Sequence, residues 1–326
     1  MNQLQPLYDG FNSGDPADKL AALPKFPLMV DIEVTSACNF RCLMCPTGNL
    51  SLKRPAGFME KATFDHIVEQ CGEHGTAIRF IGWGEPLLHP DIVRFVLMAT
   101  KAGCLTHINT NGSRLDANLA EWLVTAGLSS IKFSFQGVDR DSYREMRNTD
   151  FFDGMIEAIR LMRRARSLHS SAGAMPWIAA STSVTDESPE RIEAFKKRIG
   201  PLVDQLSIGH TTFDYLDTKA VRLSDAERAT LERLMGLQSV EKKHPVPCPE
   251  VYGKLSIHYN GSVAVCCNAY DKTGEFGNVN QTPLKELWRH KFIEDYRRRL
   301  ARKEYTGPLC GQCWDYMSLT VGDVGT

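Results

Sequence analysis

The sequence has no strong excess of charge and no long apolar run. Its 38 Lys and Arg residues balance its 39 Asp and Glu residues, so no global field would attract nucleic acid or an anionic membrane. No apolar stretch approaches the length of a membrane span, and the polar start MNQLQPLYDGFNSGDPADKL has no apolar signal core. The basic runs RLMRRARS and YRRRLARK fit solvated faces of amphipathic helices. We therefore expect a cytoplasmic protein without nucleic-acid or membrane partners.

The chain does have ordinary globular composition and an unusual number of cysteines. Of its 326 residues, 43% are hydrophobic and 24% charged, which is enough for a sizeable core in one large domain with a smaller one, or in two domains. Ten cysteines in a cytosolic chain indicate metal or redox chemistry rather than disulfides. Cys71 and Cys104 lie in helical and strand-edge contexts and are expected to be small buried residues.

Strand-like runs alternate with amphipathic helical stretches over residues 28–223. The six runs cover residues 28–36, 77–84, 105–112, 129–137, 177–185 and 204–211. This alternation predicts βα units with a parallel sheet, whose strands end in the polar or glycine-rich segments where such folds place their chemistry. Gly103 and Gly127 stand where two of the helices should stop. Residues 1–27, rich in Asp, Gly and Pro, are expected to form an irregular lead-in.

The pattern changes over residues 224–326, which predicts a second, smaller unit. Ser224 is a plausible cap for an amphipathic helix that follows it. Residues 254–267 form two alternating runs joined by Asn260-Gly261, a strong hairpin signal. Residues 282–305 are expected to form one final helix.

Three cysteines follow the first predicted strand in the stretch SACNFRCLMCP: Cys38, Cys42 and Cys45. A structural zinc site or an electron-carrying iron–sulfur cube takes four thiolates, so three leave one position open. A zinc site with a distant fourth ligand is the alternative. The C-x3-C-x2-C spacing after a first strand resembles the radical S-adenosylmethionine (SAM) superfamily. The resemblance implies a [4Fe-4S] cluster whose open iron binds SAM, and a 5'-deoxyadenosyl radical formed from it.

The segment GWGEP at the end of the second strand resembles the Gly-Gly-Glu-Pro motif of the same superfamily. Gly84 would let the backbone approach SAM closely, and Glu85 would offer a carboxylate to its ammonium group. A plain tight turn is the alternative. Two departures from the usual pattern, Trp83 in the motif and Met44 before the third cysteine, are expected to alter only the packing near SAM.

The ends of the third and fourth strands carry further expected SAM contacts. Asn111 lies in the NTNG segment, and Ser134 and Arg147 match the serine and arginine that in relatives reach the ribose and carboxylate of SAM. Arg144 is the rival arginine. Gln136 stands where many relatives have Asp, and could mark a different substrate contact.

The second unit carries its own cysteines. Its GSVAVCC, GNV and ELW segments and closing Cys-x2-Cys resemble the extension of the SPASM and twitch subfamilies, which implies a partial (β/α)6 barrel with a C-terminal extension carrying a β-hairpin and a helix. The resemblance also implies an auxiliary [4Fe-4S] cluster, as in the shorter twitch form. Its ligands would be Cys248, Cys266, Cys310 and Cys313. Cys266 fits the hairpin pattern better than Cys267, and adjacent strand residues point to opposite faces. A four-cysteine zinc site is the alternative.

The chain also resembles the twitch-type dehydrogenases of aminocyclitol antibiotic biosynthesis. This implies oxidation of a secondary alcohol of a sugar, aminocyclitol or glycoside, with the auxiliary cluster as electron acceptor and a flavodoxin or ferredoxin as electron donor. His210, Asp214 and Tyr215 are candidates for the base that takes the hydroxyl proton. A redox-neutral epimerase, with Cys267 returning a hydrogen atom, and a ribosomal-peptide maturase are the alternatives. The first 27 residues are expected to be too few for the peptide-binding domain that such maturases often carry.

Overall fold

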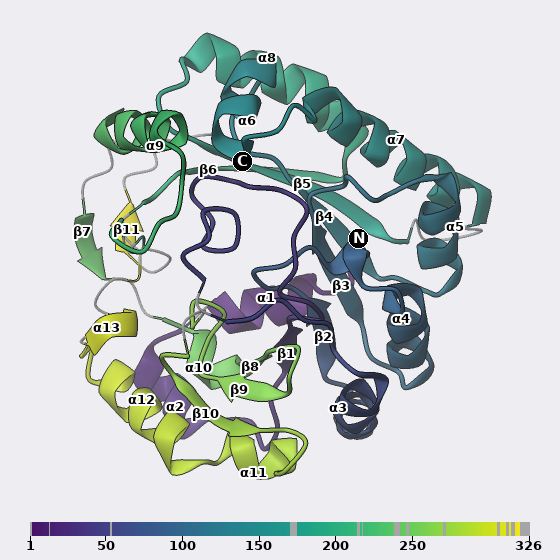
Figure 1. The fold of residues 1–326 in the computed structure, drawn as a ribbon. Helices are drawn as coiled ribbons and strands as arrows, with labels where there is room; N and C mark the ends of the chain where they lie inside the picture. Colours follow the sequence, from purple (N-terminus) through teal and green to yellow (C-terminus); the bar gives the residue numbers. More distant parts are fainter. Residues whose placement is uncertain are drawn as a thin grey trace.

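The computed structural model describes residues 2–12, 14–52, 54–169, 175–213, 216, 218–237, 242–245, 248–269, 272–304, 307–310, 313 and 317–319. Its main element is a nine-stranded sheet in the order β10-β9-β8-β1-β2-β3-β4-β5-β6. Helices cover the outside of this curved sheet, and the loop after β1 crosses its mouth (Figure 1). The sheet does not close on itself, so the architecture is a partial barrel.

Six parallel strands form the barrel, in sequence order β1 to β6. They are β1 (Met29–Ile32), β2 (Ala77–Phe80), β3 (Thr106–Thr110), β4 (Ser130–Ser134), β5 (Trp177–Val184) and β6 (Gln205–His210). Each lies within one of the six strand-like runs, so the predicted parallel α/β sheet is confirmed.

Helices connect these strands, as the amphipathic stretches predicted. They are α3 (Lys61–His74), α4 (Ile92–Lys101), α5 (Ala117–Thr125), α6 (Arg140–Arg147), α7 (Phe152–His169) and α8 (Pro189–Ile199), with 3-10 turns η1 (Pro86–Leu88) and η2 (Gly200–Leu202). Gly103 (φ +83°) and Gly127 (φ +87°) follow α4 and α5 in the left-handed region, as expected for helix stops. None of the described helices is long and apolar enough to cross a membrane.

The expectation of an irregular segment over residues 1–27 was wrong. This part contains α1 (Gln5–Asn12) and α2 (Pro16–Ala21). Asp15 caps α2 by accepting the backbone N–H of Ala17 at 2.9 Å, and Pro16 occupies the first turn. Leu4, ahead of α1, is fully buried in a cluster with Met29 and Ala77 at the starts of β1 and β2. Tertiary packing at the bottom of the barrel therefore orders a segment whose composition indicated a loop.

The C-terminal part extends the same sheet. β8 (Lys254–Ile257) pairs in parallel with β1, and β9 (Ser262–Ala264) and β10 (Glu275–Asn278) follow in antiparallel order. Gly261 has φ +83°, which confirms the predicted Asn260-Gly261 turn. The other elements are α9 (Asp225–Leu237), α10 (Glu250–Gly253), α13 (Gly307–Cys310) and a small sheet of β7 (Lys242–Pro245) with β11 (Met317–Leu319).

The expected final helix is two helices, α11 (Leu284–Trp288) and α12 (Lys291–Ala301). His290 adopts an extended conformation and accepts the N–H of Phe292 at 3.3 Å through Nδ1, so it begins a new helix. Arg297, in the second basic run, is fully buried, stacks 3.9 Å from the Trp288 ring centre and donates to the carbonyl groups of Val251 and Trp288. This arginine is structural, contrary to the expectation of a wholly solvated face.

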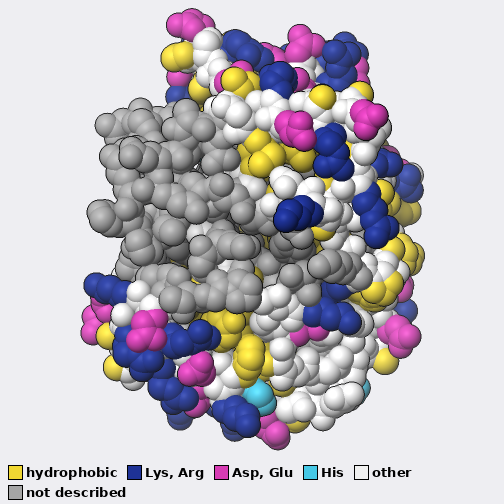
Figure 2. Space-filling view, turned by 60° about the vertical axis from the view of Figure 1, so that its left-hand side comes forward, with side chains coloured by type: hydrophobic (Ala, Val, Ile, Leu, Met, Phe, Trp, Pro, Cys, Tyr) yellow, Lys and Arg dark blue, Asp and Glu magenta, His cyan; other side chains and the backbone are white. Residues whose placement is uncertain are grey.

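On the face drawn in Figure 2, basic and acidic side chains are interspersed.

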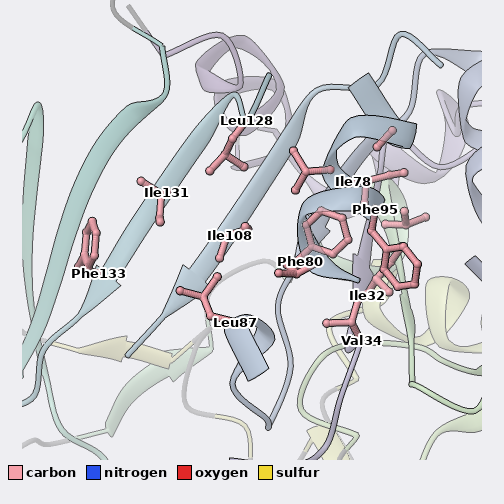
Figure 3. Packing of buried hydrophobic residues seen from close by; sticks show 14 of the residues in the cluster. Ile32, Val34, Ile78, Phe80, Leu87, Phe95, Ile108, Leu128, Ile131 and Phe133 are labelled. Atoms are coloured by element: carbon pink, nitrogen blue, oxygen red, sulfur yellow. The ribbon is translucent and has the colours of Figure 1, made fainter. Parts of the chain in front are cut away.

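Alternation along the strands separates an apolar outer face from a polar inner face. Ile32, Ile78, Ile108 and Ile131 are buried against the helices (Figure 3). Their neighbours along the strands point into the barrel. These inward residues include Asp31, Arg79, His107, Lys132 and Ser134. The barrel interior is therefore a polar lumen, open to chemistry at the carboxyl ends of the strands.

Candidate cofactor and active site

Cys38, Cys42 and Cys45 line one pocket of about 400 Å³ at the mouth of the barrel. The backbone N–H of Cys45 donates to the carbonyl of Cys42 at 3.1 Å, which forms a tight turn between them. Three donors approach the sulfur atoms: Phe40 N and Asn111 Nδ2 lie 3.5 and 3.8 Å from Cys38 Sγ, and Arg147 Nη1 lies 3.4 Å from Cys42 Sγ. Donors of this kind stabilise thiolates that ligate iron.

The chemistry of the three sulfur ligands fits a cluster. Burial raises the pKa of Cys38 to about 12 and that of Cys45 to about 11, so without a metal these thiols are neutral. Metal coordination deprotonates such thiols and removes the cost of burying them. Three cysteines line the pocket, and no fourth cysteine is among the described residues that line it. This set suits a cluster with a free iron position better than a closed four-thiolate site.

Gly84 holds the GWGEP segment against the cysteine loop. A Cβ atom on Gly84 would lie 2.1 Å from the carbonyl oxygen of Thr35 and 2.7 Å from that of Ala37. The next residue, Glu85, donates its backbone N–H to the carbonyl of Ala37 at 2.9 Å. Only glycine fits at this close approach, so the two loops meet at the edge of the pocket.

The carboxylate of Glu85 is buried and already has three donors. Leu87 N and Thr110 Oγ1 donate to Oε1 at 3.0 and 2.7 Å, and Asn111 N donates to Oε2 at 2.7 Å. Burial raises the pKa of Glu85, and these hydrogen bonds oppose the rise. Glu85 therefore joins the ends of β2 and β3 beside the pocket. Its contact with the SAM ammonium group stays a prediction.

The structure distinguishes between the two candidate arginines. Arg147 lines the pocket, where it donates to Cys42 Sγ and to the carbonyl of Ser134. Arg144 is 64% exposed and lies 3.8 Å from Asp141 on the outside of α6. Ser134 and Asn111 line the same pocket as Arg147. The predicted SAM contacts thus gather around the three cysteines, and Arg144 does not.

Gln136 also lines this pocket, and its side chain donates to Thr211 Oγ1 at 2.9 Å. Residues that the sequence did not single out join it on β5, where Ser181 and Ser183 face the same space. Their signal was the run of three polar residues, Ser181 to Ser183, near the carboxyl end of the strand-like stretch WIAASTSVT.

The structure describes one of the three base candidates, His210, and it is not among the described residues that line the pocket. His210 is in register with Val184, the buried residue that follows the pocket-lining Ser183 on β5. Alternation therefore places His210 on the helix-facing side of the sheet. Asp214 and Tyr215 lie outside the described residues.

Cys267 lies close to the pocket on its lumen side. It lines a small cavity of about 10 Å³ that shares Ile81, Gly82 and Trp83 with the larger pocket. Its Sγ lies within 4.8 Å of carboxylate oxygens of Asp31 and Glu250. The indole N–H of Trp83 donates to its carbonyl oxygen at 2.9 Å. Trp83, which replaces a glycine of the usual motif, thus joins the GWGEP loop to the C-terminal hairpin.

Cys266 faces a second group of cysteines. Burial raises the pKa of the Cys248 and Cys266 thiols. A negative charge on a neighbouring cysteine sulfur would raise these pKa values further. Cys313 accepts a hydrogen bond from Asn268 Nδ2 at 3.6 Å, and its N–H donates to the carbonyl of Cys310 at 3.2 Å. Four thiols of this kind fit a closed metal cluster. The ligand role of Cys266 rather than Cys267 stays a prediction, which their separate surroundings support.

Comparison with known proteins agrees with this geometry. The Radical SAM superfamily matches residues 32–175, and the SPASM iron-sulfur cluster-binding domain matches residues 248–314. A PqqA peptide cyclase from Gluconobacter oxydans (strain 621H) is 26% identical over 288 residues, which are 82% of this chain and 77% of that protein.

Two solved structures share the fold. BtrN in complex with AdoMet and 2-DOIA has a TM-score of 0.56 at 17% identity, covering 89% of this chain and 98% of that one. Streptococcus suis SuiB bound to the precursor peptide SuiA has a TM-score of 0.65 at 17% identity, covering 86% and 69%. These structures show the shared fold, and the two family matches show that the chain has a radical SAM domain and a SPASM domain, whose cofactors are SAM and [4Fe-4S] clusters.

Proposed function

We propose that this radical SAM enzyme oxidises a secondary alcohol of a sugar, aminocyclitol or glycoside to a ketone. When bound, SAM and its cluster would supply a 5'-deoxyadenosyl radical that removes the carbinol hydrogen atom, while a base would take the hydroxyl proton and an auxiliary cluster would accept the remaining electron. One observation carries the proposal. Cys266, in the second cysteine group, is joined directly to Cys267, which lines a cavity that shares three residues with the SAM pocket. A second redox centre beside the substrate space suits net oxidation.

The chain's own residues bind and orient in this proposal. Cys38, Cys42 and Cys45 would hold the first cluster, while Gly84 allows the close backbone approach that shapes the SAM pocket. Arg147 and Ser134 border the same space, where a guanidinium can pair with a carboxylate. The loop over the mouth and the polar lumen beneath it would enclose a hydrogen-bonding substrate such as a sugar.

The test uses anaerobically reconstituted enzyme with SAM and reductant. Small-molecule and peptide fractions of source-cell extract are added separately, and 5'-deoxyadenosine above background is recorded with any mass change. Stimulation by the small-molecule fraction, with loss of two hydrogen atoms from a sugar-like compound, supports the dehydrogenase. The same stimulation with deuterium uptake from heavy water and no other mass change indicates an epimerase.

Peptide modification is the second candidate, because the peptide cyclase relative aligns over 82% of this chain. Stimulation by the peptide fraction alone would support it and contradict both sugar reactions. The matched control replaces all three first-group cysteines with alanine. This variant should lose SAM cleavage but keep the iron held by the second group, since the two groups lie on different segments. Loss of all iron would contradict two independent sites.

A further inference from the structure

Within the part of the chain that the structure describes, Lys132 on the inner face of the barrel has no anionic partner. Lys132 lies on β4, in register with Asn109 on β3 and Ala179 on β5. It is partly buried, and no hydrogen bond or ion pair joins its ammonium group to any residue that the structure describes. Ser134, two residues further along β4, lines the SAM pocket, so Lys132 sits about 7 Å deeper along the strand.

The other lumen charges already cancel one another. Arg79 donates to both oxygens of Asp31, at 2.6 and 2.9 Å. Lys254 lies 3.0 Å from Asp31 and 2.7 Å from Glu250. Two carboxylates thus face two cations, and neither carboxylate is available to Lys132.

The remaining titratable neighbours supply no negative charge. His107 contacts Ser130 Oγ at 2.6 Å and Asn109 Oδ1 at 2.7 Å, and burial with nearby cations lowers its pKa to about 3, so it is neutral. Glu33 forms an ion pair with Arg54, with 2.6 Å between Oε1 and Nη1. Cys267 is the other titratable neighbour, and its ionised form would favour the ammonium group of Lys132. None of the described lumen carboxylates discussed above is therefore left to pair with Lys132.

Lys132 is partly withdrawn from water, and an ammonium group in such a place without an anionic partner is unfavourable. Burial and the like charges of Arg79 and Lys254 lower the pKa of Lys132 to about 8, while Asp31 opposes them. The ammonium form still predominates at pH 7. An anion entering the lumen would therefore meet a partly desolvated cation that has no anionic partner among the residues that the structure describes.

We propose that Lys132 binds an anionic group of the substrate, a carboxylate or a phosphate. The inference rests on the proposed alcohol oxidation and narrows its substrate class to anionic sugar derivatives. A cationic aminocyclitol would meet the ammonium group of Lys132 in the lumen. The anion would sit at the depth of Lys132, with the rest of the sugar extending toward the pocket lined by Ser134.

Binding tests this proposal without turnover. Holoenzyme with SAM and no reductant is titrated calorimetrically with four probes: glucuronate, glucose 6-phosphate, glucose and glucosamine. We expect glucuronate or glucose 6-phosphate to bind roughly ten- to hundredfold more tightly than glucose, as expected for one hydrogen bond to a charged group. Which of the two binds more tightly distinguishes a carboxylate from a phosphate. Glucosamine should bind most weakly.

Three variants locate the effect. Lys132→Met should abolish the preference for anions, Lys132→Arg should retain it, and Lys197→Met, at an exposed lysine, should leave it unchanged. Circular dichroism and iron content check that each variant folds. The comparison of the four probes on the wild-type enzyme tests the proposal even if a variant fails to fold. Equal binding of glucose and the anions, tighter glucosamine, no binding of any probe, or an unchanged preference in Lys132→Met would each overturn the proposal. Failure of the alcohol oxidation itself would appear only in the turnover assay.

Discussion

The buried pair Glu33–Arg54 gives a quantitative prediction about the site. Arg54 Nη1 and Nη2 lie 2.6 and 3.0 Å from the two oxygens of Glu33, and both side chains are 3% exposed. Glu33 Oε2 also accepts the backbone N–H of Trp83, in the GWGEP segment, at 3.0 Å. Arg54→Met leaves a buried carboxylate that, among the described residues, keeps His258 and this N–H as its polar neighbours. Removing one partner of such a pair costs about 3–5 kcal/mol of the free energy of unfolding.

The pH dependence of this loss follows from Glu33. Desolvation would raise its pKa, but hydrogen bonds and charges from His258 and Arg54 outweigh it, so the pKa is lowered on folding. A carboxyl with a lowered pKa stabilises the fold above its unfolded value, and that contribution is lost as the pH falls. The difference between wild type and Arg54→Met should therefore be largest near neutral pH and shrink below about pH 4.5, the ordinary range of a glutamate.

The assay is denaturant unfolding of anaerobic holoenzyme, with SAM affinity measured alongside. Arg140→Met, which breaks an exposed pair with Asp150, is the matched control and should cost under about 1 kcal/mol. Glu33→Met combined with Arg54→Met should cost less than Arg54→Met alone, because no buried charge is left unpaired. An Arg54→Met variant as stable as the control, or a double variant less stable than the single, would refute the reasoning.

Three further predictions concern single residues. Gly84→Ala should lower SAM-dependent 5'-deoxyadenosine formation by about a hundredfold, since its Cβ would lie 2.1 Å from the Thr35 carbonyl oxygen; unchanged SAM affinity would contradict this. Cys267→Ser should leave ketone formation largely intact, whereas an epimerase would accumulate unquenched or oxidised product, seen by mass spectrometry. Lys132→Met should raise holoenzyme stability by about 1–3 kcal/mol at pH 7. That gain should fade as the pH rises from about 8 toward 10.5, because the folded lysine loses its proton in this range while the unfolded lysine still holds it. A gain that stays constant with pH in thermal scans would argue against a desolvated ammonium group.

The sequence was sufficient for the barrel and the two cysteine groups because local signals determine both. Strand-helix alternation and the Asn260-Gly261 turn act over a few residues, and the cysteine spacing is itself local. The N-terminal helices escaped prediction because Leu4 and its neighbours are ordered by distant strands. The break at His290 escaped it because a histidine N-cap is a weak signal inside a helical pattern.

The ion-pair partners inside the lumen could not be predicted, since they depend on which strands are neighbours in the sheet. Alternation shows that Asp31 and Lys254 face inward, but only the β1–β8 ladder brings these side chains to within 3.0 Å. That none of the described lumen carboxylates is left for Lys132 becomes visible once each has been assigned. The same limit applies to Arg144 and Arg147, which are three positions apart on one helix and differ in which side of it meets the barrel.

The β1–β8 ladder also means that the predicted boundary at residue 224 does not separate two independent bodies. The first cysteine loop follows β1, and Cys266 follows β9, which pairs with β8. The distance between the two cysteine groups is therefore set by hydrogen bonds of one continuous sheet rather than by a linker. The indole of Trp83 adds a hydrogen bond from the GWGEP segment to the carbonyl of Cys267. A rigid spacing of this kind suits transfer of an electron out of a substrate held between the two groups, which is the step that distinguishes oxidation from a redox-neutral reaction.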